Sequence, residues 1–406
     1  EPPKDARTGD GPVCVASADL NGDGIADVVV GTRYDGAQLL VGKGDGTFQE
    51  ARDYPTGATT YHLTVADVDG DGCPDIITAN NDSTVSVLLN NGDGTFQPPQ
   101  SFASGLANTA VTTGDVNGDD KLDIAVSNFS DDTVSLLLGN GDGTFQPRQP
   151  FAIGSQPGAV LIGDVNRDGQ ADIVGTNGGG GTVSVLLGNG DGSFQSQQAF
   201  RAGDLPGKTE LQDFNGDGLV DLVTANVRDG NGNLLAGNGD GTFDAPVVFP
   251  IGADAAGLAT TDLDGDGHLD LITANFRSDS VSFVRGNGDG TFQSTQTVTL
   301  GKNRYSVTVA DINGDGKPDV LKTNLRQNTV SVELGTGSGS FEPARTVDVG
   351  AQPTSVRVAD FNDDGRLDLV TTNSGDDSVS AALGNGDGTF NEQQTFEVGR
   401  SPRSVA

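Results

Sequence analysis

The sequence predicts an all-β fold, an eight-bladed β-propeller of four-stranded antiparallel blades. A nine-residue acidic motif occurs eight times, and successive copies start 48 or 49 residues apart. Four short apolar runs, separated by glycine-rich turns, fill each interval, and no segment has helical periodicity. A repeat of this length that contains four short strands is typical of a propeller blade.

The repeats run from residue 12 to residue 401, which leaves no room for a second domain. The predicted blades cover residues 12–59, 60–107, 108–156, 157–205, 206–254, 255–303, 304–352 and 353–401. Residues 1–11 are polar and contain proline, so we expect a flexible N-terminal segment. The tail at 402–406 resembles the start of a further repeat, and residues 11–15 occupy the same register. Two segments therefore compete for one innermost strand, and the chain is either frayed at one end or part of a longer array.

Each blade is expected to contain the same elements in the same order. In the fifth repeat, residues 208–212 read as the first strand and residues 222–225 as the second. In the second repeat, a tight turn at 80–84 leads to a third strand at 85–90. A G-N-G-D-G-T-F turn and a fourth strand follow. The turn ends in a phenylalanine that we assign to the core, at positions 48, 96, 145, 194, 243, 292, 341 and 390.

The acidic motif reads D-x-[DN]-x-D-x-x-x-D, as in Asp213, Asn215, Asp217 and Asp221. A Ca²⁺ ion takes six to eight oxygen ligands, and a tight loop can supply them from positions 1, 3, 5, 7 and 9. Position 7 varies freely, as expected if only its backbone carbonyl binds the metal. The motif lacks the glutamate at position 12 and the flanking helices of an EF-hand. Mg²⁺ is the less suitable ion, because it demands octahedral geometry and keeps its waters.

We therefore predict about eight calcium ions per chain, one in each blade. The predicted ligands, loop by loop, are Asp19, Asn21, Asp23, Ile25, Asp27; Asp67, Asp69, Asp71, Cys73, Asp75; Asp115, Asn117, Asp119, Lys121, Asp123; Asp164, Asn166, Asp168, Gln170, Asp172; Asp213, Asn215, Asp217, Leu219, Asp221; Asp262, Asp264, Asp266, His268, Asp270; Asp311, Asn313, Asp315, Lys317, Asp319; and Asp360, Asn362, Asp364, Arg366, Asp368.

Asp, Asn and Gly are also ordinary turn residues, so one copy of the motif could be a turn without a metal. Eight copies with a fourth aspartate at position 9 favour a metal site, since a simple turn is expected to have no use for that aspartate. Glycine normally occupies position 6, where we expect a positive φ. Asp120 replaces it in the third copy, and aspartate tolerates the left-handed region better than most residues. Arg167 and Asp363 replace the glycine at position 4, which we expect to be a milder change.

The repeat V-x-x-x-D-x-N-G-D-G-x-x-D-L-x-x-x-N, followed by G-x-G-D-G-T-F, resembles the FG-GAP or VCBS repeat over residues 12–401. This repeat builds the N-terminal propeller of integrin α-subunits and occurs in bacterial VCBS-repeat proteins. The resemblance implies that the calcium loop joins the first and second strands on one face, and that partners bind on the opposite face. Integrin propellers have seven blades with the motif in only some of them, whereas this chain has eight repeats that all carry it. Lectin-like propellers and eight-bladed rhamnogalacturonan lyases share the repeat type.

The formal charge of -34 disfavours nucleic acid and anionic membranes as partners. No apolar stretch is long enough for a membrane span. Calcium loops saturate in extracellular fluid, so we expect a secreted or cell-surface protein, and we expect it to be a monomer. The chain contains no methionine, which indicates a processed or excised product. Cys14 and Cys73 lie at different expected heights on their blades, which favours two thiols over a disulfide.

No catalytic motif is evident, and both histidines have structural explanations: His268 occupies position 7 of a loop, and His62 starts a strand. Departures from the repeat occur on the face opposite the loops. These departures are Arg33, Tyr34, Tyr61, Arg277, Arg304, Tyr305 and Arg326. We interpret them as a surface for a protein or glycan ligand; the alternative is that they are scattered surface residues. The predicted function is a non-catalytic adhesion, recognition or scaffold module. The alternative is a carbohydrate-active propeller enzyme such as a rhamnogalacturonan-type polysaccharide lyase.

Overall fold

The computed structural model describes residues 12–32, 36–43, 48–49, 51–57, 59–253, 255–263, 265–275, 280–299, 307–317, 319–336, 341–362 and 364–397. Within these ranges all regular elements are strands, and they form eight four-stranded sheets. No helix that could cross a membrane occurs in this part of the chain. The predicted all-β class and the eight blades are confirmed.

The first four blades follow one another along the chain. Their strands are β1 (Pro12–Ala18), β2 (Asp27–Thr32), β3 (Ala37–Leu40), β4 (Arg52–Tyr54); β5 (Thr60–Ala66), β6 (Asp75–Asn80), β7 (Thr84–Leu88), β8 (Gln100–Ala103); β9 (Asn108–Gly114), β10 (Asp123–Asn128), β11 (Thr133–Leu137), β12 (Gln149–Ala152); and β13 (Pro157–Gly163), β14 (Asp172–Asn177), β15 (Thr182–Leu186), β16 (Gln198–Arg201).

The other four blades repeat this order. Their strands are β17 (Pro206–Gln212), β18 (Asp221–Asn226), β19 (Asn231–Leu235), β20 (Val247–Pro250); β21 (Ala255–Thr261), β22 (Asp270–Asn275), β23 (Ser280–Val284), β24 (Gln296–Thr299); β25 (Val307–Ala310), β26 (Asp319–Asn324), β27 (Thr329–Glu333), β28 (Arg345–Asp348); and β29 (Pro353–Ala359), β30 (Asp368–Asn373), β31 (Ser378–Ala382), β32 (Gln394–Glu397).

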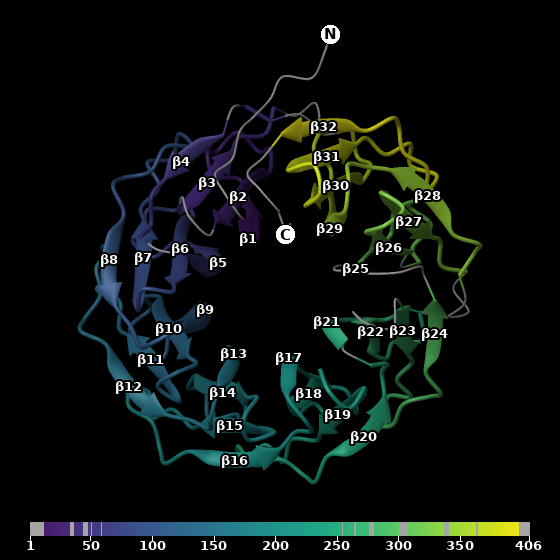
Figure 1. The fold of residues 1–406 in the computed structure, drawn as a ribbon. Helices are drawn as coiled ribbons and strands as arrows, with labels where there is room; N and C mark the ends of the chain where they lie inside the picture. Colours follow the sequence, from purple (N-terminus) through teal and green to yellow (C-terminus); the bar gives the residue numbers. More distant parts are fainter. Residues whose placement is uncertain are drawn as a thin grey trace.

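Neighbouring strands in each blade are antiparallel and follow chain order. The first strand of every blade lies next to the central axis and the fourth lies at the rim (Figure 1). The second strand of a blade lies between the first and third strands and is buried along its whole length. In β10, for example, all six residues are buried. The rim strand β8 alternates between half-buried and exposed residues, as expected for the edge of a sheet.

Strand β1, residues 12–18, is the innermost strand of the first blade. Val15 pairs with Val30 and Ala18 with Asp27, so β1 takes the position for which two segments compete in the sequence. Each blade is therefore built from one contiguous piece of chain. The predicted flexible segment at 1–11 and the predicted tail at 402–406 lie outside the described residues.

Aromatic pairs hold neighbouring blades together, which explains the recurring phenylalanine. Tyr54 on β4 packs edge-on against Phe96 of the next blade, with ring centroids 5.2 Å apart. Phe102 and Phe145 repeat the arrangement one blade further on, also at 5.2 Å. Phe96 and Phe145 are buried, and Phe96 forms a bridge with Asn90 that closes the end of the third strand. The assignment of this phenylalanine to the core is confirmed in these blades.

The ring closes through packing of the first blade against the last. Phe48 lies 6.0 Å from Phe361 and 6.1 Å from Phe396, measured between ring centroids. Val28 and Val370 belong to the same buried cluster. No strand is exchanged across this junction among the described residues, and burial of these apolar side chains stabilises it.

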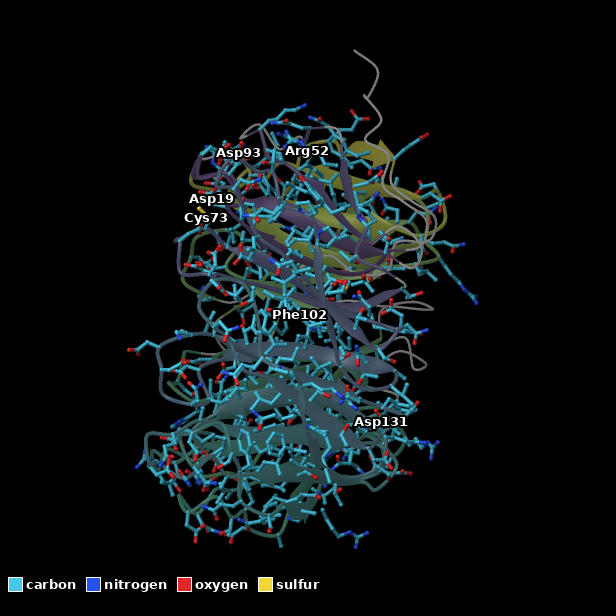
Figure 2. The ribbon with its side chains drawn as sticks, turned by 90° about the vertical axis from the view of Figure 1, so that its left-hand side faces the viewer. Asp19, Arg52, Cys73, Asp93, Phe102 and Asp131 are labelled. Atoms are coloured by element: carbon cyan, nitrogen blue, oxygen red, sulfur yellow. The ribbon has the colours of Figure 1, made fainter. Side chains whose placement is uncertain are left out.

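The two faces of the propeller carry different connections. The acidic loops between first and second strands lie on one face together with the turns between third and fourth strands, as the positions of Asp19, Cys73 and Asp93 show (Figure 2). Asp131, in the turn between β10 and β11, lies on the opposite face (Figure 2). Both cysteines are free, as predicted.

Candidate metal centres and ligand-binding surfaces

The eight acidic loops, numbered loop 1 to loop 8 along the chain, share one set of hydrogen bonds. In every loop the aspartate at position 1 accepts a bond from the backbone N–H of position 6, at 2.7–2.9 Å. The aspartate at position 5 accepts a bond from the N–H of position 7, at 2.7–3.1 Å. These bonds wind the backbone around the carboxylates, so all eight motifs adopt one local structure.

The aspartate at position 9 has a structural role that the sequence analysis missed. Its Oδ2 accepts the backbone N–H of position 2 at 2.8–3.0 Å in all eight loops. Its Oδ1 accepts the backbone N–H of the residue two positions after the third strand, at 2.7–2.9 Å. The expectation that this aspartate has no use outside a metal site is therefore wrong, because it ties the loop to the blade.

Burial raises the pKa of the carboxyl at position 9. The side chain is fully buried in every blade, and desolvation is the largest cause of the shift in the seven described groups for which one is resolved. In Asp75 the pKa rises to about 7. The backbone N–H bonds act in the opposite direction, and the nearby aspartates of the same loop add to the rise. A bound cation would reverse the contribution of those charges.

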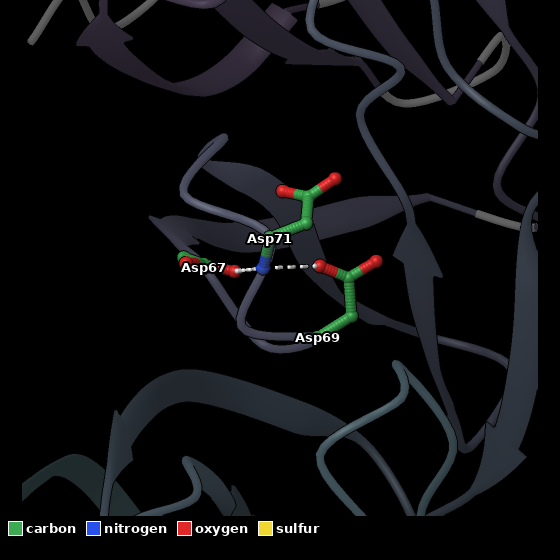
Figure 3. A group of neighbouring side chains, drawn as sticks. All are labelled: Asp67, Asp69 and Asp71. Atoms are coloured by element: carbon green, nitrogen blue, oxygen red, sulfur yellow. Dashed lines mark hydrogen bonds between the residues drawn. The ribbon is translucent and has the colours of Figure 1, made fainter.

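Loop 2 brings three carboxylates together. Asp67, Asp69 and Asp71 each place one oxygen within 4.8 Å of the others (Figure 3). Oxygens bound to one Ca²⁺ at 2.3–2.6 Å lie at most about 5 Å apart, so this spacing suits the ion. Burial raises the pKa of Asp69, followed by the charges of Asp71 and Asp67. Asp75, also predicted as a ligand, is not part of this group.

Loop 4 contains an unpaired carboxylate oxygen. Oδ1 of Asp164 is buried and has no hydrogen-bond partner, whereas the corresponding oxygen of Asp19 accepts the N–H groups of Gly22 and Asp23. Arg167 occupies position 4 in this loop instead of glycine. A buried anionic oxygen without a donor is costly, and a cation is the partner that would satisfy it. The donor set of loop 4 therefore fits a hard cation.

Both position 4 and position 6 require the left-handed conformation. Asp120 at position 6 of loop 3 has φ 61° and keeps its N–H bond to Asp115 at 2.8 Å, which confirms that aspartate can replace the glycine. Arg167 at position 4 of loop 4 has φ 60°. The expectation that position 4 is the milder site is not supported by the backbone, since Gly22 and Gly70 also have positive φ there.

The side chain at position 7 packs against the glycine-rich turn of its own blade. A Cβ added to Gly288 would come within 2.2 Å of the His268 ring, and one added to Gly92 within 3.1 Å of the Cys73 sulfur. In loops 3, 7 and 8 position 7 is cationic and pairs with the aspartate at position 5. Lys317 lies 3.1 Å from Asp315, and these exposed pairs partly neutralise the loops that contain them.

Loop 1 also touches the next blade. Asn90 in blade 2 donates to the carbonyl of Leu20 in loop 1 at 2.8 Å. A Cβ added to Gly94 would lie 3.1 Å from the Cβ of Asn21. A change in loop 1 therefore reaches the interface between blades 1 and 2 directly.

Of the predicted ligand-surface residues, the structure describes only Tyr61 and Arg326, and it does not bring these two together. Tyr61 is exposed in blade 2, and Arg326 is exposed in the turn between β26 and β27 of blade 7. Blades 1 and 8 separate them (Figure 1). Arg33, Tyr34, Arg277, Arg304 and Tyr305 lie outside the described residues, as does Asp264 of loop 6.

A cleft of about 710 Å³ lies between blades 4 and 5 on the face opposite the acidic loops, and we call it the glycine cleft. Its floor is the turn Gly178–Gly181 between β14 and β15, where other blades carry side chains. Arg201, Arg228, Asp204 and Asp229 stand around it. Arg228 lies 4.0 Å from Asp204, and both are more than half exposed. The four consecutive glycines are a sequence signal that would have marked this site.

Close packing accounts for part of the glycine run. A Cβ at position 181 would come within 2.5 Å of the Gly203 carbonyl, and one at position 179 within 2.6 Å of the Ser155 hydroxyl. Because glycine has no side chain, the space above the turn is also left open. The cleft therefore combines a backbone floor with two guanidinium and two carboxylate groups at its rim.

Comparison with protein families assigns the chain. The FG-GAP-like repeat matches residues 19–78, 67–126, 125–175, 213–273, 262–322, 323–371 and 360–406. The chain belongs to the FG-GAP-like repeat family. All eight acidic loops lie within the matched segments, so the resemblance drawn from the motif is confirmed. A search of the curated proteins found no match for this FG-GAP-like repeat protein.

Solved structures share the fold at low sequence identity. A lectin from Agrocybe aegerita that recognises non-reducing terminal N-acetylglucosamine is 24% identical, with a TM-score of 0.53, over 82% of this chain and 93% of the lectin. A periplasmic gluconolactonase from Pseudomonas aeruginosa is 18% identical, with a TM-score of 0.51, over 72% and 86%. A protein from Lactobacillus plantarum is 12% identical, with a TM-score of 0.55, over 93% and 98%. Since a lectin and an enzyme both have this fold, the fold does not separate recognition from catalysis.

Proposed function

We propose that this FG-GAP-like repeat protein is an extracellular recognition module, stabilised by calcium, that binds a glycan in the glycine cleft without turning it over. The proposal that the protein binds calcium rests on the three clustered carboxylates of loop 2. The proposal that it binds a glycan rests on the glycine cleft. The extracellular setting follows from the calcium part, because such loops are suited to the calcium concentrations found outside cells.

Calcium is supported by the donor chemistry of the loops. Three carboxylate oxygens within 4.8 Å in loop 2 repel one another, and the buried Asp164 oxygen in loop 4 has no donor. A divalent ion offsets both costs. At free calcium of 100 times the dissociation constant, each site would add about 2.7 kcal/mol to the free energy of unfolding.

A glycan suits the glycine cleft because its rim offers both donors and acceptors. The guanidinium groups of Arg201 and Arg228 donate hydrogen bonds, and the carboxylates of Asp204 and Asp229 accept them from hydroxyl groups. The volume of about 710 Å³ falls in the range of small-molecule sites, roughly 300–1,000 Å³. The similarity to a lectin of the same fold supports a carbohydrate ligand over a protein.

The proposal is tested by glycan-array binding of calcium-saturated protein. Glycan binding should be lost in Arg201→Ala and Arg228→Ala, while Lys43→Ala, at an exposed lysine on the other face, should bind normally. Arg326→Ala tests the surface predicted from the sequence. Binding to no glycan, or binding that survives both cleft substitutions, would overturn the glycan site. Release of ultraviolet-absorbing unsaturated sugars from an acidic polysaccharide would show instead that the protein is a lyase.

A further inference from the structure

A second cavity, of about 540 Å³, lies on the axial side of the inner strands. Its walls come mainly from β5, β9, β13 and β17, which are the first strands of four consecutive blades (Figure 1). Three titratable side chains line it: His62 on β5, and Lys208 and Glu210 on β17. We call this cavity the channel site, and it is distinct from the glycine cleft.

The titratable residues break the repeat at two positions of the inner strand. Five residues before the eight loops the chain has Cys14, His62, Ala110, Ala159, Lys208, Gly257, Ser306 and Ser355. Three residues before the loops it has Ala16, Thr64, Thr112, Leu161, Glu210, Ala259, Thr308 and Arg357. Blade 5 alone carries charges at both positions. Alanines at the first of these positions in blades 3 and 4 leave space between β5 and β17, whereas Arg357 is turned toward Thr308 and the Val356 carbonyl.

His62 lines this cavity, and its ring contains one nitrogen without a hydrogen-bond partner. Burial, followed by the charge of Lys208, lowers its pKa to about 4, so the imidazole is neutral at pH 7. A hydrogen bond to the Val111 backbone acts the other way, as expected when a ring N–H donates to a carbonyl. Nδ1 is buried and has no partner. With the other ring nitrogen protonated, Nδ1 is left as an acceptor that needs a donor.

Lys208 and Glu210 are not satisfied by each other. No ion pair within 4.0 Å involves Lys208 in the part of the chain that the structure describes, although its charge partly offsets the rise in the Glu210 pKa that burial causes. The residues of β9 and β13 that line the cavity are all uncharged. The site therefore presents one cation and one carboxylate, with room between them, beside the neutral His62 ring.

We propose that the channel site binds a small hydroxylated carboxylate, such as a hydroxy acid or sugar acid. Its carboxylate pairs with Lys208 and its hydroxyl groups donate to Glu210, beside the neutral His62 ring. Charge-assisted bonds to the ammonium select an anion, and the carboxylate of Glu210 selects hydroxyl groups over apolar substituents. This inference is independent of the glycan proposal, because the two sites share no residue that lines both.

The chain offers an internal control for the test, since His62 and His268 are its only histidines. Histidine-selective NMR of the calcium-saturated protein, at constant free calcium, would follow both rings during titration with gluconate. Glucitol, which lacks the carboxylate, and acetate, which lacks the hydroxyls, serve as probes of each requirement. The His62 signals should shift saturably with gluconate, far less with glucitol or acetate, while His268 stays unchanged.

Variants complete the test. Lys208→Met should weaken gluconate binding about tenfold or more, as loss of a charge-assisted bond implies. Glu210→Gln should weaken it less, and Lys43→Met should leave it unchanged. An unaltered His268 signal and melting temperature would show that each variant is folded. The proposal is overturned if the His62 signals do not respond to gluconate, if acetate produces the same response, or if Lys208→Met binds as the wild type does.

Discussion

Two neighbouring aspartates of loop 5 separate the structural role of the motif from its metal role. Asp221 at position 9 is fully buried and accepts the N–H groups of Phe214 at 3.0 Å and Gly237 at 2.8 Å. Asp217 at position 5 is exposed and accepts the N–H of Leu219 at 2.7 Å. We expect Asp221→Asn to destabilise the blade with or without calcium, and Asp217→Asn to do so mainly when calcium is present.

The magnitudes follow from the bonds. Asparagine keeps one acceptor at position 221 and turns its amide N–H toward the other backbone donor. A hydrogen bond to a charged group contributes about 1.5–3 kcal/mol and an unsatisfied buried donor costs about 1–3 kcal/mol. Relief of carboxylate burial offsets part of this, so the expected loss is about 2–4 kcal/mol. For Asp217→Asn the expected loss is the calcium contribution of that site, about 2.7 kcal/mol at 100 times the dissociation constant.

Urea unfolding measured by circular dichroism, in chelator and in saturating calcium, would test both values. Each substitution should act on blade 5 and its neighbours, since repeat proteins are stabilised by nearest-neighbour contacts. If Asp221→Asn is as stable as the wild type in chelator, the structural role is wrong. If Asp217→Asn loses the same free energy in both buffers, position 5 does not act through a metal.

Further predictions concern thiols, a buried ion pair and pH. Partial burial and the nearby loop carboxylates raise the pKa of Cys73. Bound calcium would offset these negative charges and favour the thiolate, so it should accelerate alkylation of Cys73; a rate independent of calcium would contradict this. Burial raises the pKa of Cys14 to about 12, so Cys14 should react only on unfolding. Lys322→Met should cost about 3–5 kcal/mol, because it leaves the carboxylate of Glu333 buried and unpaired, and adding Glu333→Leu should recover most of the loss in denaturant titrations. The pKa of Asp75 is raised to about 7 in the folded protein, so its protonated carboxyl stabilises the fold fully below about pH 4. This contribution is lost as the pH rises to 7, and the melting temperature in chelator should therefore fall between pH 4 and pH 7. Constant melting temperature between pH 4 and pH 7 would count against it.

The regular features of the fold were predictable because each is repeated in the sequence. The spacing of the motif predicted the blades, and the recurring Phe96 and Phe145 predicted the packing between them. The tolerance of Asp120 for a positive φ followed from its residue type. Periodicity reports on backbone and core, which are the same in every blade.

Features that depend on neighbouring segments were not predictable in this way. The role of Asp221 depends on the N–H of Gly237, which lies two residues after the end of β19. The competition for the innermost strand was decided by the pairing of β1 with β2, since both candidates have the same pattern. The channel site joins His62 to Lys208, which are distant in sequence and meet only when four blades curve around the axis.

We propose that calcium binding by the acidic loops stabilises this propeller. The first experiment is to strip the protein of metal, titrate it with Ca²⁺, follow thermal unfolding and count the bound ions by elemental analysis. We expect about eight ions per chain and a large rise in the melting temperature that saturates with occupancy. Few bound ions and an unchanged melting temperature would contradict it, and would leave the acidic loops as turns held by their own hydrogen bonds.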